Sequence, residues 1–436
     1  MPLTQSPGKI RTIEIRTIAL LGAFCFFLSV LEYMVPKPLP FIRLGLAMLP
    51  LLLALDILPF SSFAILVGLK VIGQALISGT LFSYVFLFSL GGTGFSALLM
   101  YLLRRGLGKE RISLIGVSAA GALASNAAQL VLAYYLVFGE SVRYAAAPVL
   151  ALGIVTGSLL GILSEYFIQH SRWYAGLDLN LSHMETQRHE DSALPSNYLS
   201  LYLNSSSVSS VPPCENKKKK FYQFRKAREA FCLKLFNPSE LAAAGLCMIP
   251  ALLLNPDTVS RAIQFLFFFF LAWLMGKKIN LFLMFSVMLA IVFFNLLVPY
   301  GELLFSIGPL AITSGALMGG IRRAVTLEGL LMLSRCCISR DIALPSVLRL
   351  GAFGEIAGES FRIFSHLTEE KQPLNRHNWV SRLDALLIAY GETSTLAAAE
   401  AREPKPGMPG RNFASRIILA AAVILAWLPF MLTALF

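Results

Sequence analysis

Long apolar runs, separated by short polar breaks, follow one another along most of the chain. A helix that crosses a bilayer needs about 20 consecutive, mostly apolar residues, and the runs approach this length. The predicted spans are residues 16–35, 44–58, 60–78, 81–103, 112–138, 147–168, 239–254, 260–275, 279–299, 302–320 and 413–436. The pattern therefore predicts an all-α, polytopic membrane protein.

A polar, basic stretch from Gln169 to Lys234 separates the apolar runs into two groups. It contains a serine-rich segment, the pair Pro212-Pro213 and the lysine block from Lys217 to Lys220. This composition is typical of a linker between two membrane-embedded halves. The predicted divisions are a first membrane domain at 1–168, a linker at 169–233 and a second membrane domain at 234–436.

Basic residues cluster in the short loops between the predicted spans. The clusters Arg104–Arg111, Gly276–Lys278 and Arg322-Arg323 each follow an even number of spans. An excess of Lys and Arg marks cytoplasmic loops, so these clusters agree with a cytoplasmic N-terminus and a cytoplasmic linker. The charge pattern predicts a multi-pass protein of the inner (cytoplasmic) membrane.

Residues 321–411 differ from the rest of the second half, because charges are frequent there and prolines interrupt the chain. Apolar residues recur at helical spacing in Leu327–Arg335 and in Ile356–Leu367, which predicts amphipathic helices at or below the cytoplasmic face. Helices that lie on lipid and helices that dock partners share this pattern. Both uses stay open for this cytoplasmic module.

The composition argues against several classes of protein. Of the 436 residues, 56% are apolar and 14% are charged, whereas soluble domains carry about 25% charged residues. The formal net charge of +12 resides mostly in short loops, so we predict the lipid bilayer and not nucleic acid as a partner. The chain has no GxxxxGK[ST] loop, no paired aspartates and no Cys or His at metal-ligand spacing. We therefore predict no catalytic residue, no metal, no cofactor and no enzymatic activity.

Lys70 lies near the middle of the third predicted span, and Gln74 and Ser78 follow it on the same helical face. A cation at this depth costs at least about 2.5–3.5 kcal/mol, so it faces protein or water. One interpretation is a cavity wall that binds an anionic or polar ligand. The other is a lysine that extends to the membrane interface or pairs with Asp56.

Ser125, Asn126 and Gln129 cluster on one surface of the fifth predicted span. Their side chains provide donors and acceptors that suit either a ligand or a neighbouring helix, and the two interpretations stand equal. In the fourth span, the glycines of the segment 91–94 predict a loosened helix next to protein or a cavity.

Small residues one helical turn apart predict close helix packing. The positions are Ala19 and Ala23 in the first span, Gly153, Gly157 and Gly161 in the sixth, and Gly315 and Gly319 in the second half.

Several motifs carry a family resemblance over residues 15–168. They are Arg43-Leu44-Gly45-Leu46-Ala47, Lys70-Val71-Ile72-Gly73, Ser78-Gly79-Thr80-Leu81, Ile115-Gly116-Val117-Ser118 and Asn126-Ala127-Ala128-Gln129-Leu130. With these motifs the first half resembles the Gx transporter family, often labelled heptaprenyl diphosphate synthase component I. That family is related to the substrate-binding S components of energy-coupling factor (ECF) transporters. Met48 and Lys70 depart from the family pattern, which tends to have asparagine and arginine at these positions.

The resemblance implies a six-helix bundle with a ligand pocket toward the outer face. It implies that the first-helix residues Ala19 and Ala23 contact a T component. The ligand-binding candidates that it implies are Arg43, Lys70, Gln74, Asn126 and Gln129.

Residues 234–436 resemble an ECF T component more faintly, through Ile312-Thr313, Thr326–Leu330, Arg335, the cytoplasmic module 321–411 and a final span. T components couple to ATPase subunits through arginine-centred motifs. The implied ATPase-coupling candidates are Arg322, Arg323 and Arg335.

These observations predict an ECF-type membrane transport component. Its S-like half binds a small molecule, such as a vitamin, a flavin or a quinone- or isoprenoid-related compound, and its T-like half couples to separate ECF-type ATPase subunits. The alternative is a membrane component of heptaprenyl or isoprenoid diphosphate synthesis, and a third possibility is a scaffold without a ligand.

Overall fold

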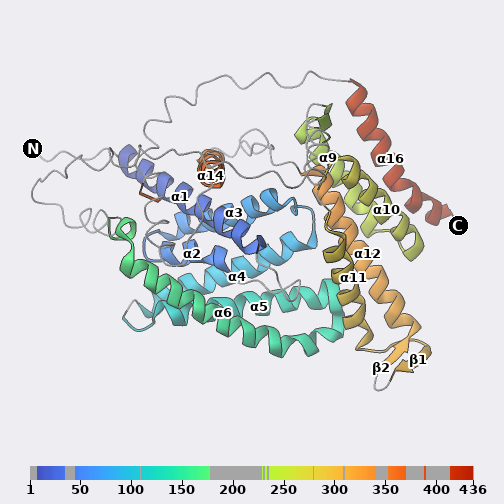
Figure 1. The fold of residues 1–436 in the computed structure, drawn as a ribbon, viewed down its shortest axis with the longest axis horizontal. Coiled ribbons are helices and arrows are strands. Elements are labelled where there is room, and N and C mark those ends of the chain that lie inside the picture. The colour runs from blue at the N-terminus through green and yellow to red at the C-terminus, as the bar shows by residue number, and fades with distance from the viewer. Residues whose placement is uncertain are drawn as a thin grey trace, which may run out of the picture.

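The computed structural model describes eleven stretches of the chain. They are residues 7–34, 45–108, 110–176, 228, 231–232, 235–277, 279–307, 310–338, 352–369, 387–388 and 413–435. Almost all regular structure in these residues is helical, as predicted, and the helices form two groups that lie side by side (Figure 1).

The first group forms one bundle around a shared apolar core. Its elements are α1 (Pro7–Met34), η1 (Leu46–Met48), α2 (Leu49–Ala54), α3 (Phe60–Ser78), α4 (Tyr84–Leu107), α5 (Leu114–Ala133), η2 (Tyr134–Phe138), η3 (Gly139–Ser141) and α6 (Val142–His170). α6 extends beyond the predicted end at 168, and Trp173 and Tyr174 join the same core. The beginning of the predicted linker therefore packs with the first half through Trp173 and Tyr174.

The second predicted span, 44–58, is the element that differs most in the first half. It forms the short η1 and then α2, which has only six residues and is therefore about 9 Å long. All six α2 residues are buried, so this apolar run fills the core of the bundle. The prediction of a full crossing was wrong because an apolar run has the same composition in a core as in lipid.

The second group contains α9 (Pro238–Leu253), α10 (Thr258–Leu274), α11 (Leu281–Leu296), α12 (Ser314–Cys337) and α16 (Phe413–Leu435). A second apolar core joins these helices. Between α11 and α12, β1 (Leu303–Ile307) and β2 (Leu310–Thr313) form an antiparallel hairpin. The predicted span at 302–320 was wrong, because its first part is this hairpin and its last part begins α12.

The prediction of an amphipathic surface helix at Leu327–Arg335 was also wrong. This segment forms the second part of α12, and most of its residues are buried against α9, α10 and α11. The second predicted amphipathic helix is present as α14 (Ala352–Glu369). The rest of the predicted module up to 411, apart from residues 387–388, lies outside the described residues, as does nearly all of the predicted linker.

Five segments of the described residues are long and apolar enough to cross a membrane. They are Ile15–Glu32, Phe60–Ser78, Tyr84–Leu107, Leu114–His170, which runs from α5 through α6, and Phe413–Leu432. Large apolar side chains are exposed on several of these helices, for example Leu159 on α6 and Ile424 on α16. Contiguous exposed apolar surface is unusual for a soluble protein, so the chain has the character of a multi-pass membrane protein.

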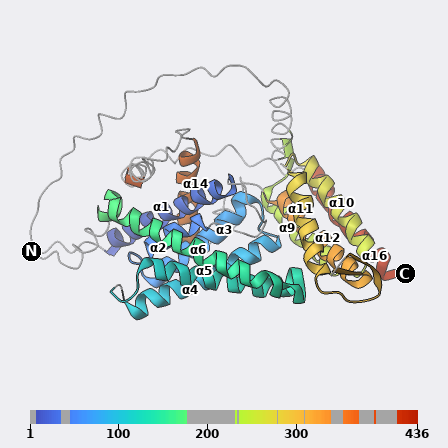
Figure 2. The same ribbon diagram turned by 60° about the horizontal axis from the view of Figure 1, so that its bottom comes forward.

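The two groups contact each other through α11 and α12. α12 packs against α4 and η2, and α11 packs against η2 and η3. α14, which follows α12 in the sequence, packs on α1 and α3 of the first group (Figure 2). A third apolar cluster joins Val137 and Phe138 of η2 to Ile291 of α11 and Leu327 of α12. The halves therefore share a packed interface.

Candidate functional site

A cavity of about 80 Å³ lies inside the first bundle and receives residues from all six of its helices. We call it the polar cavity. It is lined by Glu32, Gly45, Ala47, Met48, Leu52, Lys70, Gln74, Thr93, Ser96, Met100, Ser118, Ala122, Ser125, Asn126, Gln129, Thr156, Gly157 and Leu160. The predicted ligand candidates Lys70, Gln74, Asn126 and Gln129 come from two separate spans, and the bundle brings them to one place.

Lys70 of α3 forms part of the wall and is only 4% exposed. Its Nζ donates a hydrogen bond of 2.8 Å to Oγ1 of Thr93 on α4 and lies 3.7 Å from Sδ of Met48. The ammonium group thus faces protein and not lipid. This placement argues against the interpretation that Lys70 extends to the membrane interface.

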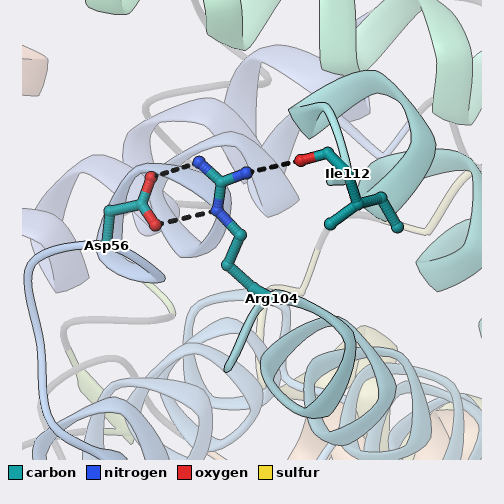
Figure 3. A network of polar contacts seen from close by, with 3 residues as sticks. All are labelled: Asp56, Arg104 and Ile112. Atoms are coloured by element: carbon teal, nitrogen blue, oxygen red, sulfur yellow. Dashed lines mark hydrogen bonds and ion pairs between the residues drawn. The ribbon is translucent and has the colours of Figure 1, made fainter. Parts of the chain in front are cut away.

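The Asp56 interpretation of Lys70 also finds no support, because Asp56 is engaged by another cation. Arg104, near the end of α4, donates from Nε to Oδ1 of Asp56 at 2.9 Å and from Nη2 to Oδ2 at 2.7 Å, and its Nη1 donates to the carbonyl of Ile112 at 2.8 Å (Figure 3). The bidentate geometry is the one that arginine and carboxylate favour. This network lies outside the polar cavity, since none of its three residues lines the cavity.

Gln74 lies one helical turn after Lys70 and lines the same wall. Its Oε1 is buried and has no hydrogen-bond partner among the described residues. A buried acceptor without a partner costs about 1–3 kcal/mol. The amide oxygen therefore provides a ready acceptor for a donor that enters the cavity.

The opposite wall comes from α5. Nδ2 of Asn126 donates to the carbonyl of Val149 on α6 at 2.8 Å, and Nε2 of Gln129 donates to Oγ of Ser125 at 3.2 Å. The sequence left open whether these amides serve a ligand or a neighbouring helix. The structure gives Asn126 a hydrogen bond between two helices and also a position in the cavity wall.

Glycines allow the cavity walls to approach each other. A Cβ at Gly92 would lie 2.5 Å from Nε2 of Gln129 and 2.9 Å from Oγ of Ser125. α4 stays helical through the glycines at 91–94, so the predicted loosening of this helix was wrong. Gly92 serves close packing of α4 on α5.

Sequence reasoning missed Glu32, at the end of the first predicted span. Its Oε1 accepts a hydrogen bond of 3.3 Å from the backbone N–H of Gly45. Glu32 lines the polar cavity together with Lys70, and the two side chains carry opposite charges. The overlooked signal is that Glu32 is a carboxylate within a long apolar run, where a charged group is costly. Arg43, the remaining ligand candidate, lies outside the described residues.

The predicted packing residues of the first half lie at helix contacts. Gly153, Gly157 and Gly161 face α5, where a Cβ at Gly157 would lie 2.6 Å from Cβ of Ala122. Ala19 and Ala23 are fully buried on α1, which packs against α3 and α14.

The three predicted ATPase-coupling arginines lie at two places along α12. Arg322 and Arg323 lie in the first part of α12, and Arg335 lies roughly 18 Å further along its axis. Nη1 of Arg323 donates to Oδ1 of Asn295 at 2.6 Å and to the carbonyl of Val137 at 3.5 Å. Arg323 is therefore used inside the molecule, at the contact between the halves.

Two family models match parts of the chain. Residues 21–167 match the family described as heptaprenyl diphosphate synthase component I. The first half resembles this family. All residues that line the polar cavity lie within the matched range, and the resemblance read from the motifs is confirmed. Residues 240–340 match a domain of unknown function, DUF8519, and neither a curated protein nor a solved structure matches the chain.

The chemical groups in the cavity wall limit what the polar cavity can bind. The polar cavity combines an ammonium group, a carboxylate, three side-chain amides and several hydroxyls. These groups supply donors and acceptors inside the bundle. Such a site can hold a small polar molecule or the polar end of a larger one.

Proposed function

We propose that this protein is the membrane component of an ECF-type transporter of the inner membrane. Its first half binds a small molecule in the polar cavity, and its second half couples the bundle to separate ATPase subunits. The observation that carries the proposal is that the buried Lys70 lines the same cavity as Oε1 of Gln74, which has no hydrogen-bond partner among the described residues. A purely structural bundle gains nothing from burying a cation and an unsatisfied acceptor in one cavity wall.

The contact between α14 and α1 supports the coupling role. Phe361 of α14 stacks on Phe26 of α1 with ring centroids 5.0 Å apart, and Phe364 meets the same ring edge-on at 6.0 Å. Ser360 of α14 is fully buried there, next to Gly22 of α1. A helix from the second half that packs on the ligand-binding bundle is suited to transmit movement from an ATPase to that bundle.

Uptake into proteoliposomes tests the proposal. The full chain, reconstituted with ECF-type ATPase subunits, is expected to take up a vitamin, flavin or quinone-related compound only when ATP is present, and Lys70→Met is expected to abolish the uptake. An Arg172→Met variant, outside the cavity wall, is the control for reconstitution. Uptake that needs no ATP, or that survives Lys70→Met unchanged, would contradict the proposal.

The family description of residues 21–167 favours a second candidate, a non-catalytic membrane component of isoprenoid diphosphate synthesis. The chain carries no paired aspartates of the kind that hold magnesium and diphosphate, so this role would be accessory. A prenyl-transfer assay with and without the chain separates the two candidates. A change in product length or yield on adding the chain would support the synthase role.

A further inference from the structure

A second cavity, of about 150 Å³, lies where the two halves of the molecule meet. We call it the apolar cavity. It is lined by residues of α4, α5, η2, α6 and α11, among them Phe88, Leu130, Val137, Val149 and Ile291. Apart from Tyr84, Asn126, Gln129 and Thr156, the side chains in this wall are apolar.

The two cavities adjoin each other. Asn126, Gln129 and Thr156 line both of them. Nδ2 of Asn126 and the hydroxyl of Thr156 bond to backbone carbonyls of α6, and Nε2 of Gln129 bonds to Ser125 within α5. All three side chains are thus hydrogen-bonded to α5 or α6, and they mark the passage from polar to apolar surroundings.

The polar cavity defines what the head of a ligand would have to present. The ammonium group of Lys70 presents a donor to this wall, whereas the buried Oε1 of Gln74 has no donor among the described residues. Because Glu32 also lines this cavity, the wall carries one charge of each sign. An uncharged head with both an acceptor and a donor matches this wall better than an anion does.

We propose that the two cavities form one site for an amphipathic ligand. Its uncharged, hydrogen-bonding head lies between Lys70 and Gln74, and its apolar chain passes Gln129 into the apolar cavity. This inference deepens the proposed function. The site for the head rests on the proposed function, whereas the site for the apolar chain rests on the apolar cavity.

The apolar cavity also has a wall from the second half, at Val287 and Ile291 of α11. A chain bound there touches both halves at once. α11 in turn contacts η2 at the end of α5. Occupation of the chain site would therefore tighten the contact through which the second half acts on the bundle.

Two fluorescent probes that differ only in the chain test this inference. 4-Quinolone carries an N–H donor and a carbonyl acceptor, and 2-heptyl-4-quinolone adds an apolar chain. Binding is measured on the full chain in lipid nanodiscs, with empty nanodiscs to subtract partition into lipid. Because each buried methylene adds about fourfold to affinity, the heptyl compound is expected to bind at least about tenfold more tightly than the parent.

Variants locate the head and the chain separately. Val287→Trp, which fills the apolar cavity, is expected to lower the affinity for the heptyl compound to that for the parent. The affinity for the parent is expected to stay unchanged. Leu289→Trp on the same helix, at a position 71% exposed and outside the cavity wall, is the matched control and is expected to change neither affinity. Lys70→Met and Gln74→Leu are each expected to lower the affinity for both compounds about tenfold or more.

Equal affinities for the two quinolones, with binding still lost in Lys70→Met and Gln74→Leu, would overturn the chain site and leave the proposed function standing. Unchanged heptyl binding in Val287→Trp would also overturn it, and would assign the apolar cavity to membrane lipid. If neither compound binds, the amphipathic ligand is wrong, and the uptake assay decides the proposed function independently.

Discussion

At the scale of single residues, buried charges show how this bundle tolerates polar groups. Lys70 is satisfied in part by Thr93, and Arg104 by Asp56 and a backbone carbonyl. The two cations differ in their surroundings, because Arg104 has a bidentate carboxylate whereas Lys70 faces a cavity. Arg104 therefore serves the fold, and Lys70 remains placed to meet a ligand.

The Arg104–Asp56 pair is expected to be essential for stability. Both side chains are less than a tenth exposed, so Asp56→Ala leaves a buried guanidinium without its counter-ion and is expected to cost about 3–5 kcal/mol of unfolding free energy. The double variant Asp56→Ala, Arg104→Met removes the charge as well and is expected to recover most of the loss. Denaturant unfolding in detergent measures both. A double variant as unstable as Asp56→Ala would show that the charge is not the cause.

At the scale of elements, glycines determine how closely α6 packs on α5. A Cβ at Gly157 would lie 2.6 Å from Cβ of Ala122 and 3.0 Å from Cα of Ala119. Neither neighbour has a long side chain that can move away. The hydroxyl of Ser118 also donates to the carbonyl of Gly157 at 2.7 Å, so the close approach carries an interhelical hydrogen bond. The small-residue motif is thus a contact surface and not a chance repeat.

Gly157→Ala is expected to destabilise the first bundle by about 1–3 kcal/mol, because the two helices must separate. Gly94→Ala is the matched control, since it lies in α4 with nothing within 4 Å of the added Cβ. Alanine there is expected to stabilise the protein by about 0.5–1 kcal/mol, because glycine is the poorer helix former. Thermal unfolding of the two variants in one detergent makes the comparison. Equal shifts would contradict the role of Gly157 as a packing contact.

At the scale of the whole molecule, α12 connects the two halves at two places. Toward its N-terminal part, Arg323 and Asn295 of α11 both donate to the carbonyl of Val137. Roughly 16 Å further along the helix, Oγ of Ser334 donates to the carbonyl of Gly79 at 2.8 Å and accepts from the N–H of Phe82 at 3.0 Å. Two separated connections resist rotation better than one, so α12 holds the bundle in a defined orientation.

The contact between the halves is expected to persist when the covalent connection is cut. A protease site placed within residues 177–227 of the full chain allows cleavage after purification, and the wild-type halves are expected to co-elute. The variant Arg323→Met, Ser334→Ala, Phe361→Ala, Phe364→Ala is expected to separate on the same column, because both connections through α12 and the ring contacts of α14 with Phe26 are lost.

Arg322→Met is the matched control, since Arg322 is exposed and its Nε bonds to Thr258 in the same half. Its halves are expected to stay together. If the wild-type halves separate on cleavage, the packed interface does not hold the molecule together, and coupling through α12 would need the linker.

The sequence by itself determined that this is a helical, multi-pass membrane protein, and it located α3, α4, α5 and α6 closely. It did so because the thickness of the bilayer sets the length of an apolar span, and this length can be recognised without knowing which helices pack together. It also selected Lys70 and Gln74, because a cation in an apolar run is costly wherever the chain folds. These are local properties of the chain.

Only the tertiary structure decided which apolar runs cross and which polar groups meet. The runs at 44–58 and 302–320 have the hydropathy of spans, yet one fills a core and the other begins as a hairpin. Asp56 pairs with Arg104, 48 residues away, and Glu32 joins the cavity of Lys70. Contacts between distant segments depend on how the helices pack, and packing is a property of the whole set of side chains rather than of any one stretch.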